Sequence, residues 1–547
     1  MRRFALLLLG CMATGVLAAP VQAETLRVGI ATEPWDLDPA IRTDTGSGYL
    51  IQNIYDPLVE IGPDRTVTSE YAIAKNWQWS NELKTLTMEI KSGITFHNGS
   101  KLTAEDVAYN INWQLDPEND APNKGLIGPV ESVNVKSPTK LVVTFSEPYP
   151  GALQNWARAL DGIVPEGAHG ERSEEKGTAG FAGTRLSRDP VGSGPYKFVE
   201  WVSGSHITLE RTDNYWAENV AAPEKVVFEF IKDPAAKLSA LISGSVDIVD
   251  KVPFRDFSTI KRMPGLQTKR MPGTHTELLY LNLSAPPFGV KEGNHDNEQA
   301  VQRAYHARKF LFHAIDREEI ADEIFYGMAT VQRGPWYPDS DWVSPALSDI
   351  TLHDEQLARK HLKKAGYADG DMDFRIMATN AQWFVDVATV IQEQLRTYGV
   401  DVEVVPLDKS AFFDTMYETM NWEVGMEDWQ LNNFSALSWL YSGYYRNNHN
   451  HNHWHHAAED LKDSYHPSIP GHEKFVELYD QAVTEPDAGK RKQLVYKMQE
   501  MATEKVIQVD MMFINNLFAW RDSVEGYGEG LTSEGDINLR YVRSFDG

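Results

Sequence analysis

Several short segments alternate apolar and polar residues, which predicts β-strands because successive side chains of a strand point to opposite faces of a sheet. In the first of them, Leu26, Val28 and Ile30 share one face. Comparable strand-like patterns mark residues 86–90, 207–211, 374–378 and 400–404. Strands therefore contribute to most parts of the predicted fold.

Longer segments carry apolar residues at helical spacing and predict amphipathic helices. They cover residues 235–243, 307–325, 354–365, 385–398 and 490–505. The helix at 385–398 lies between two predicted strands, and such a β-α-β unit implies parallel strands with a right-handed crossover. No repeat with a period of roughly 20–50 residues is present, which argues against solenoids and propellers. The pattern predicts a mixed α/β fold in more than one lobe.

The N-terminal segment has the three parts of a secretory signal peptide. Arg2 and Arg3 precede an apolar run over residues 4–19, and Val21-Gln22-Ala23 supplies the small residues that signal peptidase accepts. A membrane anchor needs about 20 apolar residues, which this run does not reach. We expect cleavage between Ala23 and Glu24 and export to the periplasm.

Cys11, the only cysteine, follows Leu8-Leu9-Gly10 in a pattern similar to a lipoprotein cleavage box. Cleavage there would leave an apolar region of residues 4–9, shorter than the usual span of about 7–15 residues, so we favour the later site. The mature chain then has no cysteine. This excludes disulfides, cysteine nucleophiles and thiolate metal sites.

Composition and missing motifs narrow the class of protein further. The chain has 547 residues, 52 Lys+Arg against 78 Asp+Glu, and a formal net charge of −26. That length allows at least two folded bodies, and the acidic balance argues against nucleic acid as a partner because no basic surplus can neutralise phosphates. The motifs G-x-x-x-x-G-K-[ST], G-x-S-x-G and H-E-x-x-H do not occur, which lowers the expectation of an enzyme. We assign no catalytic residue, cofactor or metal.

Three segments, residues 74–107, 190–216 and 314–327, together resemble the family 5 extracytoplasmic solute-binding proteins, the peptide/nickel group that serves ABC importers. The resemblance implies an α/β, two-lobed periplasmic-binding-protein fold of the large peptide-binding type, with a discontinuous first lobe and two hinge strands. The implied boundaries are a signal peptide at 1–23, a first lobe with an extra subdomain at 24–280, a second lobe at 281–511, and a C-terminal return to the first lobe at 512–547. The hinge strands are expected at Glu277–Leu283 and Val509–Ile514.

The resemblance also implies a function. The protein would be a monomer that captures a peptide or peptide-like solute in the interlobe cleft and delivers it to ABC permease and ATPase subunits at the inner membrane. Closure around the ligand removes water and strengthens the polar contacts inside.

Candidate ligand-binding residues lie in loops after strands and near one tryptophan-rich segment. They are Glu33, Trp35, Asp36, Trp383, Asp428, Trp429, Asn432, Asn433, Trp439 and Tyr441. Flat aromatic side chains bury ligands with little loss of rotamer freedom, although a single tryptophan is more often part of a core.

Two features leave the ligand open. Peptide binders of the family place an Asp shortly after the tryptophan that corresponds to Trp429, where it pairs with the peptide amine, but here residues 430–433 contain no acid. Asp428 could replace it only if the loop shifts register, so an oligosaccharide or opine-like ligand is an alternative. Five histidines within His449–His456 could hold nickel, copper or zinc, but we favour a solvated loop there.

Overall fold

A computed structural model of the chain describes residues 25–62, 65–170, 183–218, 220, 222–291, 293–294, 296–367, 371–431, 435–444, 469–532, 535 and 537–545, without the side chains of 428–430 and 441–443. The predicted signal peptide lies outside these residues. Among the residues that are described, no helix combines the length and the apolar character needed to cross a membrane.

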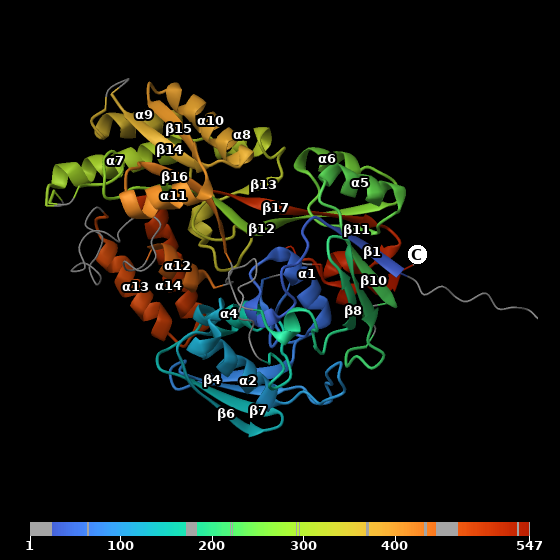
Figure 1. Cartoon of the computed structure of the whole chain (residues 1–547). Helices are drawn as coiled ribbons and strands as arrows, with labels where there is room; N and C mark the ends of the chain where they lie inside the picture. The colour runs from blue at the N-terminus through green and yellow to red at the C-terminus, as the bar shows by residue number, and fades with distance from the viewer. Residues whose placement is uncertain are drawn as a thin grey trace, which may run out of the picture.

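One large mixed sheet of eleven strands runs through the molecule (Figure 1). In spatial order its strands are β15 (Asp401–Leu407), β14 (Asp373–Thr379), β16 (Val424–Gln430), β12 (Leu266–Leu281), β17 (Val509–Arg521), β11 (Ile248–Val249), β1 (Thr25–Ile30), β10 (Lys225–Phe230), β9 (His206–Arg211) and β8 (Tyr196–Val202), and β13 (Ala329–Val331) pairs with β17 beside this path.

Strands β12 and β17 pair antiparallel and connect two separate hydrophobic cores. Leu279 and Phe513 belong to the core that we call the second lobe. Phe518 and Trp520 belong to the core that we call the first lobe, together with the apolar face of β1. The two-lobed fold with two crossing strands is therefore confirmed. The exact boundaries at 280–281 and 511–512 stay a prediction, because β12 and β17 run continuously across them.

The first lobe packs α1 (Thr45–Ile54) against β1 and β8–β10, while α5 (Pro234–Ser243) and α6 (Phe254–Ile260) contribute to an adjoining core. The C-terminal strands β18 (Val524–Glu525) and β19 (Ser544–Phe545) supply Val524 and Phe545 to the first-lobe core. The end of the chain thus returns to the lobe in which the chain begins.

A subdomain of the first lobe is built on a four-stranded antiparallel sheet with its own core. Its strands are β4 (Ala74–Ser80), β5 (Thr85–Ile90), β7 (Lys140–Phe145) and β6 (Val130–Ser137), and its helices are α2 (Ala104–Leu115), α3 (Lys124–Ile127) and α4 (Ala152–Ala159). The short pair β2 (Glu60–Ile61) and β3 (Val67–Thr68) leads into it.

The second lobe contains the predicted β-α-β unit, in which α10 (Gln382–Arg396) connects the parallel strands β14 and β15. Its other helices are α7 (Glu298–Ala314), α8 (Arg317–Glu323), α9 (Glu355–Lys364), α11 (Lys409–Asp414), α12 (Ala436–Tyr444), α13 (His472–Thr484) and α14 (Ala488–Lys505). The single helix predicted at 307–325 is wrong, because Asp316 caps a new helix by accepting hydrogen bonds from the backbone amides of Glu318 and Glu319, both at 3.1 Å.

Candidate functional site

A cavity of about 270 Å³ lies between the subdomain of the first lobe and the second lobe, and we call it the aromatic cavity. The subdomain contributes β4 and the start of α4, and the second lobe contributes the loop after β13 and the start of α12. The aromatic side chains that line it are Trp77, Trp79, Trp336, Tyr337 and Trp342. A solute in this cavity would contact both lobes at once.

A second cavity of about 560 Å³ shares lining residues with the aromatic cavity, including Gly151 and Ser435. The lobes are close here, since a Cβ atom on Gly151 would lie 3.0 Å from Ser435 Oγ. Tyr149 and Tyr479 also line this second cavity, together with the carboxylates of Glu147 and Asp480. The two cavities are neighbours between the lobes. Arg65, Arg491 and Asp341 line the first, and Glu147 and Asp480 line the second.

Arg65 belongs to the aromatic cavity and reaches across to the second lobe. Its guanidinium carbon lies 3.7 Å from the ring centroid of Tyr337, and its Nε lies 3.3 Å from a carboxylate oxygen of Asp339. Tyr337 in turn stacks on Phe513 of β17, with ring centroids 4.4 Å apart. A chain of contacts therefore runs from the first lobe to a crossing strand.

The second arginine of the aromatic cavity, Arg491, is hydrogen-bonded to the backbone. Its Nη1 donates to the backbone carbonyl of Glu485 at 2.6 Å. Burial lowers the pKa of Arg491, and the nearby Glu485 and Asp487 oppose that shift. Asp341, which lines the same cavity, is paired with Lys492 at 2.7 Å.

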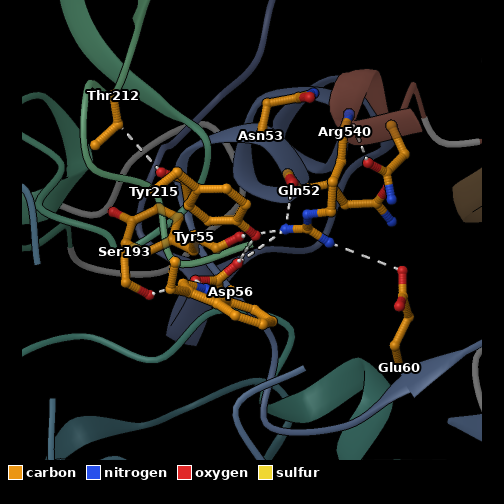
Figure 2. Close-up of polar contacts among 12 residues, drawn as sticks. Gln52, Asn53, Tyr55, Asp56, Glu60, Ser193, Thr212, Tyr215 and Arg540 are labelled. Atoms are coloured by element: carbon orange, nitrogen blue, oxygen red, sulfur yellow. Dashed lines mark hydrogen bonds and ion pairs between the residues drawn. The ribbon is translucent and has the colours of Figure 1, made fainter. Parts of the chain in front are cut away.

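A smaller cavity of about 60 Å³ lies entirely within the first lobe and is lined by charged side chains. Arg42 and Arg158 both pair with Asp161. Arg540 pairs with Asp56 at 3.1 Å and lies 3.8 Å from Glu60 (Figure 2). The cavity is polar, but its cations and carboxylates face one another.

Asp56 is the centre of this polar network. Besides the bond from Arg540, its carboxylate accepts hydrogen bonds from Ser193 Oγ at 2.9 Å, Tyr215 OH at 2.7 Å and Trp216 Nε1 at 2.8 Å (Figure 2). Burial raises the pKa of Asp56, while Arg540 and these donors oppose the shift. Burial acts to lower the pKa of Arg540, but Tyr215, Asp56 and Glu60 raise it on balance. The network fastens the C-terminal segment to the first lobe.

The predicted residues near the first strand lie in the first lobe and line none of these three cavities. Glu33 accepts hydrogen bonds from Trp201 Nε1 at 2.8 Å and from the Gly204 amide at 3.0 Å. Trp35 is 43% exposed. Burial raises the pKa of Asp36 to about 6, and its carboxylate accepts from the backbone of Asp38.

The remaining predicted residues belong to the second lobe. Trp383 on α10 stacks on Phe384, and Trp439 on α12 is buried in the core. Asp428 and Trp429 lie in β16 opposite Glu277 and Thr276 of β12, beside the crossing. Their side chains and that of Tyr441 lie outside the described part of the chain, as do Asn432, Asn433 and the segment His449–His456. Among the residues that are described, no three His, Cys, Asp or Glu side chains are placed to hold a metal ion.

The sequence-based reasoning missed the residues that line the aromatic cavity. Trp336-Tyr337 and Trp342 form a local concentration of aromatic residues that could have drawn attention to this loop. Arg65 gave no comparable signal, because its partner Tyr337 is remote in the sequence.

Comparisons with known proteins agree on one family. A model described as "Bacterial extracellular solute-binding proteins, family 5 Middle" matches residues 68–451. The glutathione-binding protein GsiB of Pectobacterium atrosepticum is 23% identical over 78% of this chain and 82% of its own length. The oligopeptide-binding protein AppA of Bacillus subtilis is 27% identical over 76% of this chain and 75% of its own length.

The fold also matches solved structures. The structure of AgaA from A.tumefacien R10, in complex with agropinic acid, superposes with a TM-score of 0.69 at 23% identity, covering 96% of this chain and 99% of AgaA. This likeness supports the two-lobed architecture.

Proposed function

Because the chain belongs to the family 5 bacterial extracellular solute-binding proteins, we propose that it is the receptor of an ABC importer that captures a peptide or peptide-like solute. The relatives named for glutathione and oligopeptides support this substrate class. The protein binds the solute between its lobes and hands it unchanged to a membrane permease driven by an ATPase.

The observation that carries the proposal is the pair of neighbouring cavities between the lobes. Aromatic side chains from both lobes line each of them, and the carboxylates of Glu147 and Asp480 line the second. Aromatic walls bury apolar side chains of a ligand with little entropic loss. A ligand held by both lobes favours the closed arrangement over an open one, because only the closed arrangement makes both sets of contacts.

The proposal includes the location and state of the protein. Removal of residues 1–23 releases a periplasmic monomer that begins at Glu24. Intact-mass measurement of protein recovered from the periplasm tests this step, and a lipid-modified N-terminus at Cys11 would contradict it.

Calorimetry tests the ligand class directly. Purified protein, freed of bound solute by partial unfolding and refolding, is titrated with a pool of di- to pentapeptides, a pool of neutral oligosaccharides and an opine. We expect heat only from the peptide pool. Binding of oligosaccharide or opine without peptide would overturn the proposal, and mass spectrometry of the solute released from freshly isolated protein would identify the true class.

A further inference from the structure

The guanidinium of Arg65 is a buried cation whose donors are only partly used. Its side chain is 9% exposed. Among the described residues, no hydrogen-bond acceptor meets Nη1 or Nη2, although both atoms are buried. Buried polar groups nearly always have a partner, and leaving donors of a charged group without one is unfavourable. These nitrogens therefore point to a ligand.

The positions of the neighbours show which nitrogens of Arg65 have a partner and which have none. Asp339 is close to Nε, and Tyr337 covers one face of the guanidinium plane. Nη1 and Nη2 form the part of the guanidinium that meets no hydrogen-bond acceptor among the described residues, although surrounding atoms shield both nitrogens from solvent. Two parallel N–H donors in this fork match the two oxygens of a carboxylate.

On the basis of the proposed function, we propose that Arg65 forms a subsite for a carboxylate of the bound peptide. The carboxylate binds end-on to Nη1 and Nη2, and the side chain next to it packs against the tryptophans of the aromatic cavity. The rest of the peptide extends into the adjoining cavity, which Gly151 and Ser435 also line.

The other charged groups of the aromatic cavity are consistent with this role. Arg491 is engaged with a backbone carbonyl, and Asp341 is paired with Lys492. Asp339 is 52% exposed and meets Arg65 only at Nε. Among the described residues, the buried side-chain nitrogens of this cavity that meet no acceptor are Nη1 and Nη2 of Arg65. As parts of a cation they favour an anionic group over a neutral one.

Three peptide pools of tri- to pentapeptides test the subsite by calorimetry. The first has free C-terminal carboxylates and no Asp or Glu, the second is the same pool as C-terminal amides, and the third consists of amides that contain Asp or Glu. We expect the wild-type protein to bind the first pool at least about tenfold more tightly than the second. Tight binding of the third pool as well would show that a side-chain carboxylate can also serve.

Variants test whether Arg65 causes the preference for free-acid peptides over amides. In Arg65→Gln the free acids and the amides should bind alike, with the affinity that the wild type has for amides. Arg65→Lys should keep part of the preference, because lysine keeps the charge without the planar fork. Arg396→Gln, which removes an exposed arginine of α10, is the control for net charge and should behave as the wild type.

Each alternative result has a separate meaning. Equal binding of acids and amides by the wild type, or a preference that survives in a folded Arg65→Gln variant, would overturn the subsite and leave the proposed function intact. Binding of none of the pools by any of the proteins would overturn the proposed function and the subsite together.

Discussion

Two buried arginines of the first lobe, Arg540 and Arg65, have similar surroundings but differ in the partners of their terminal nitrogens. Each lies near an aromatic ring and at least one carboxylate, and each side chain is at least nine-tenths buried. Arg540 pairs with Asp56 and also donates to the backbone carbonyl of Tyr55 at 3.3 Å (Figure 2). Arg65 has an ion-pair contact at Nε, but no described residue offers an acceptor to its Nη1 or Nη2. Nε of Arg540 also meets no acceptor among the described residues, so the contrast that matters lies at the terminal nitrogens Nη1 and Nη2. Burial alone therefore does not distinguish a structural arginine from a ligand-binding one, whereas the partners of its terminal nitrogens do.

The difference has a physical basis. A buried cation without a partner is unfavourable, and partners that are fixed in the same lobe remove that penalty permanently. The partners of Arg65 belong to the other lobe, so they are present only when the lobes are together. This arrangement suits a guanidinium that binds water while the lobes are apart and binds the ligand once they are together.

The largest effect is expected for Asp56→Ala, which removes the closest carboxylate of Arg540 and leaves a buried charge. Breaking a buried pair in this way lowers the free energy of unfolding by about 3–5 kcal/mol. Urea denaturation followed by circular dichroism measures the loss. Asp189→Ala, at a carboxylate that is 74% exposed, is the matched control and should change little. Equal losses in the two variants would show that the network does not hold the lobe.

Arg540→Met should destabilise less than Asp56→Ala and should do so in a pH-dependent way. Asp56 keeps its bonds from Ser193, Tyr215 and Trp216 and can become neutral. Its folded pKa is already raised by burial and rises further without the cation, above an unfolded value of about 3.9. Stability is then lost as the pH rises through the folded pKa. The thermal midpoint of the variant should lie further below that of the wild type at about pH 8 than at about pH 5. A difference in midpoint that does not change with pH would contradict this.

Arg65→Gln should leave the free energy of unfolding within about 1 kcal/mol of wild type, because few bonds are lost. The same urea experiment measures it. A loss as large as that of Asp56→Ala would place Arg65 with the structural arginines.

Asp339→Asn should have the smallest effect. It removes the carboxylate that competes for Arg65 among the described residues, and because Asp339 is half exposed the contribution of the pair is small. We expect the affinity for free-acid peptides to rise by about two- to threefold in calorimetry. A fall in affinity would mean that Asp339 positions Arg65.

The local patterns of the sequence predicted the strands β1, β5, β9, β14 and β15, because alternation reports which face of a strand is buried, whereas the crossing pair was expected from the family resemblance. The boundary at Asp316 was missed, since a capping side chain within an apolar-periodic segment leaves the period unchanged. The candidate site was harder to predict. Glu33, a predicted ligand residue, is bonded within its own lobe, and Arg65 depends on a contact with Tyr337 that only the assembled lobes create.

Strands β12 and β17 supply residues to both cores, so neither lobe possesses a complete sheet of its own. A half of the protein expressed alone would present bare strand edges, which promote self-association. The two lobes must therefore be synthesised, matured and degraded as one cooperative unit, even though each has a separate interior.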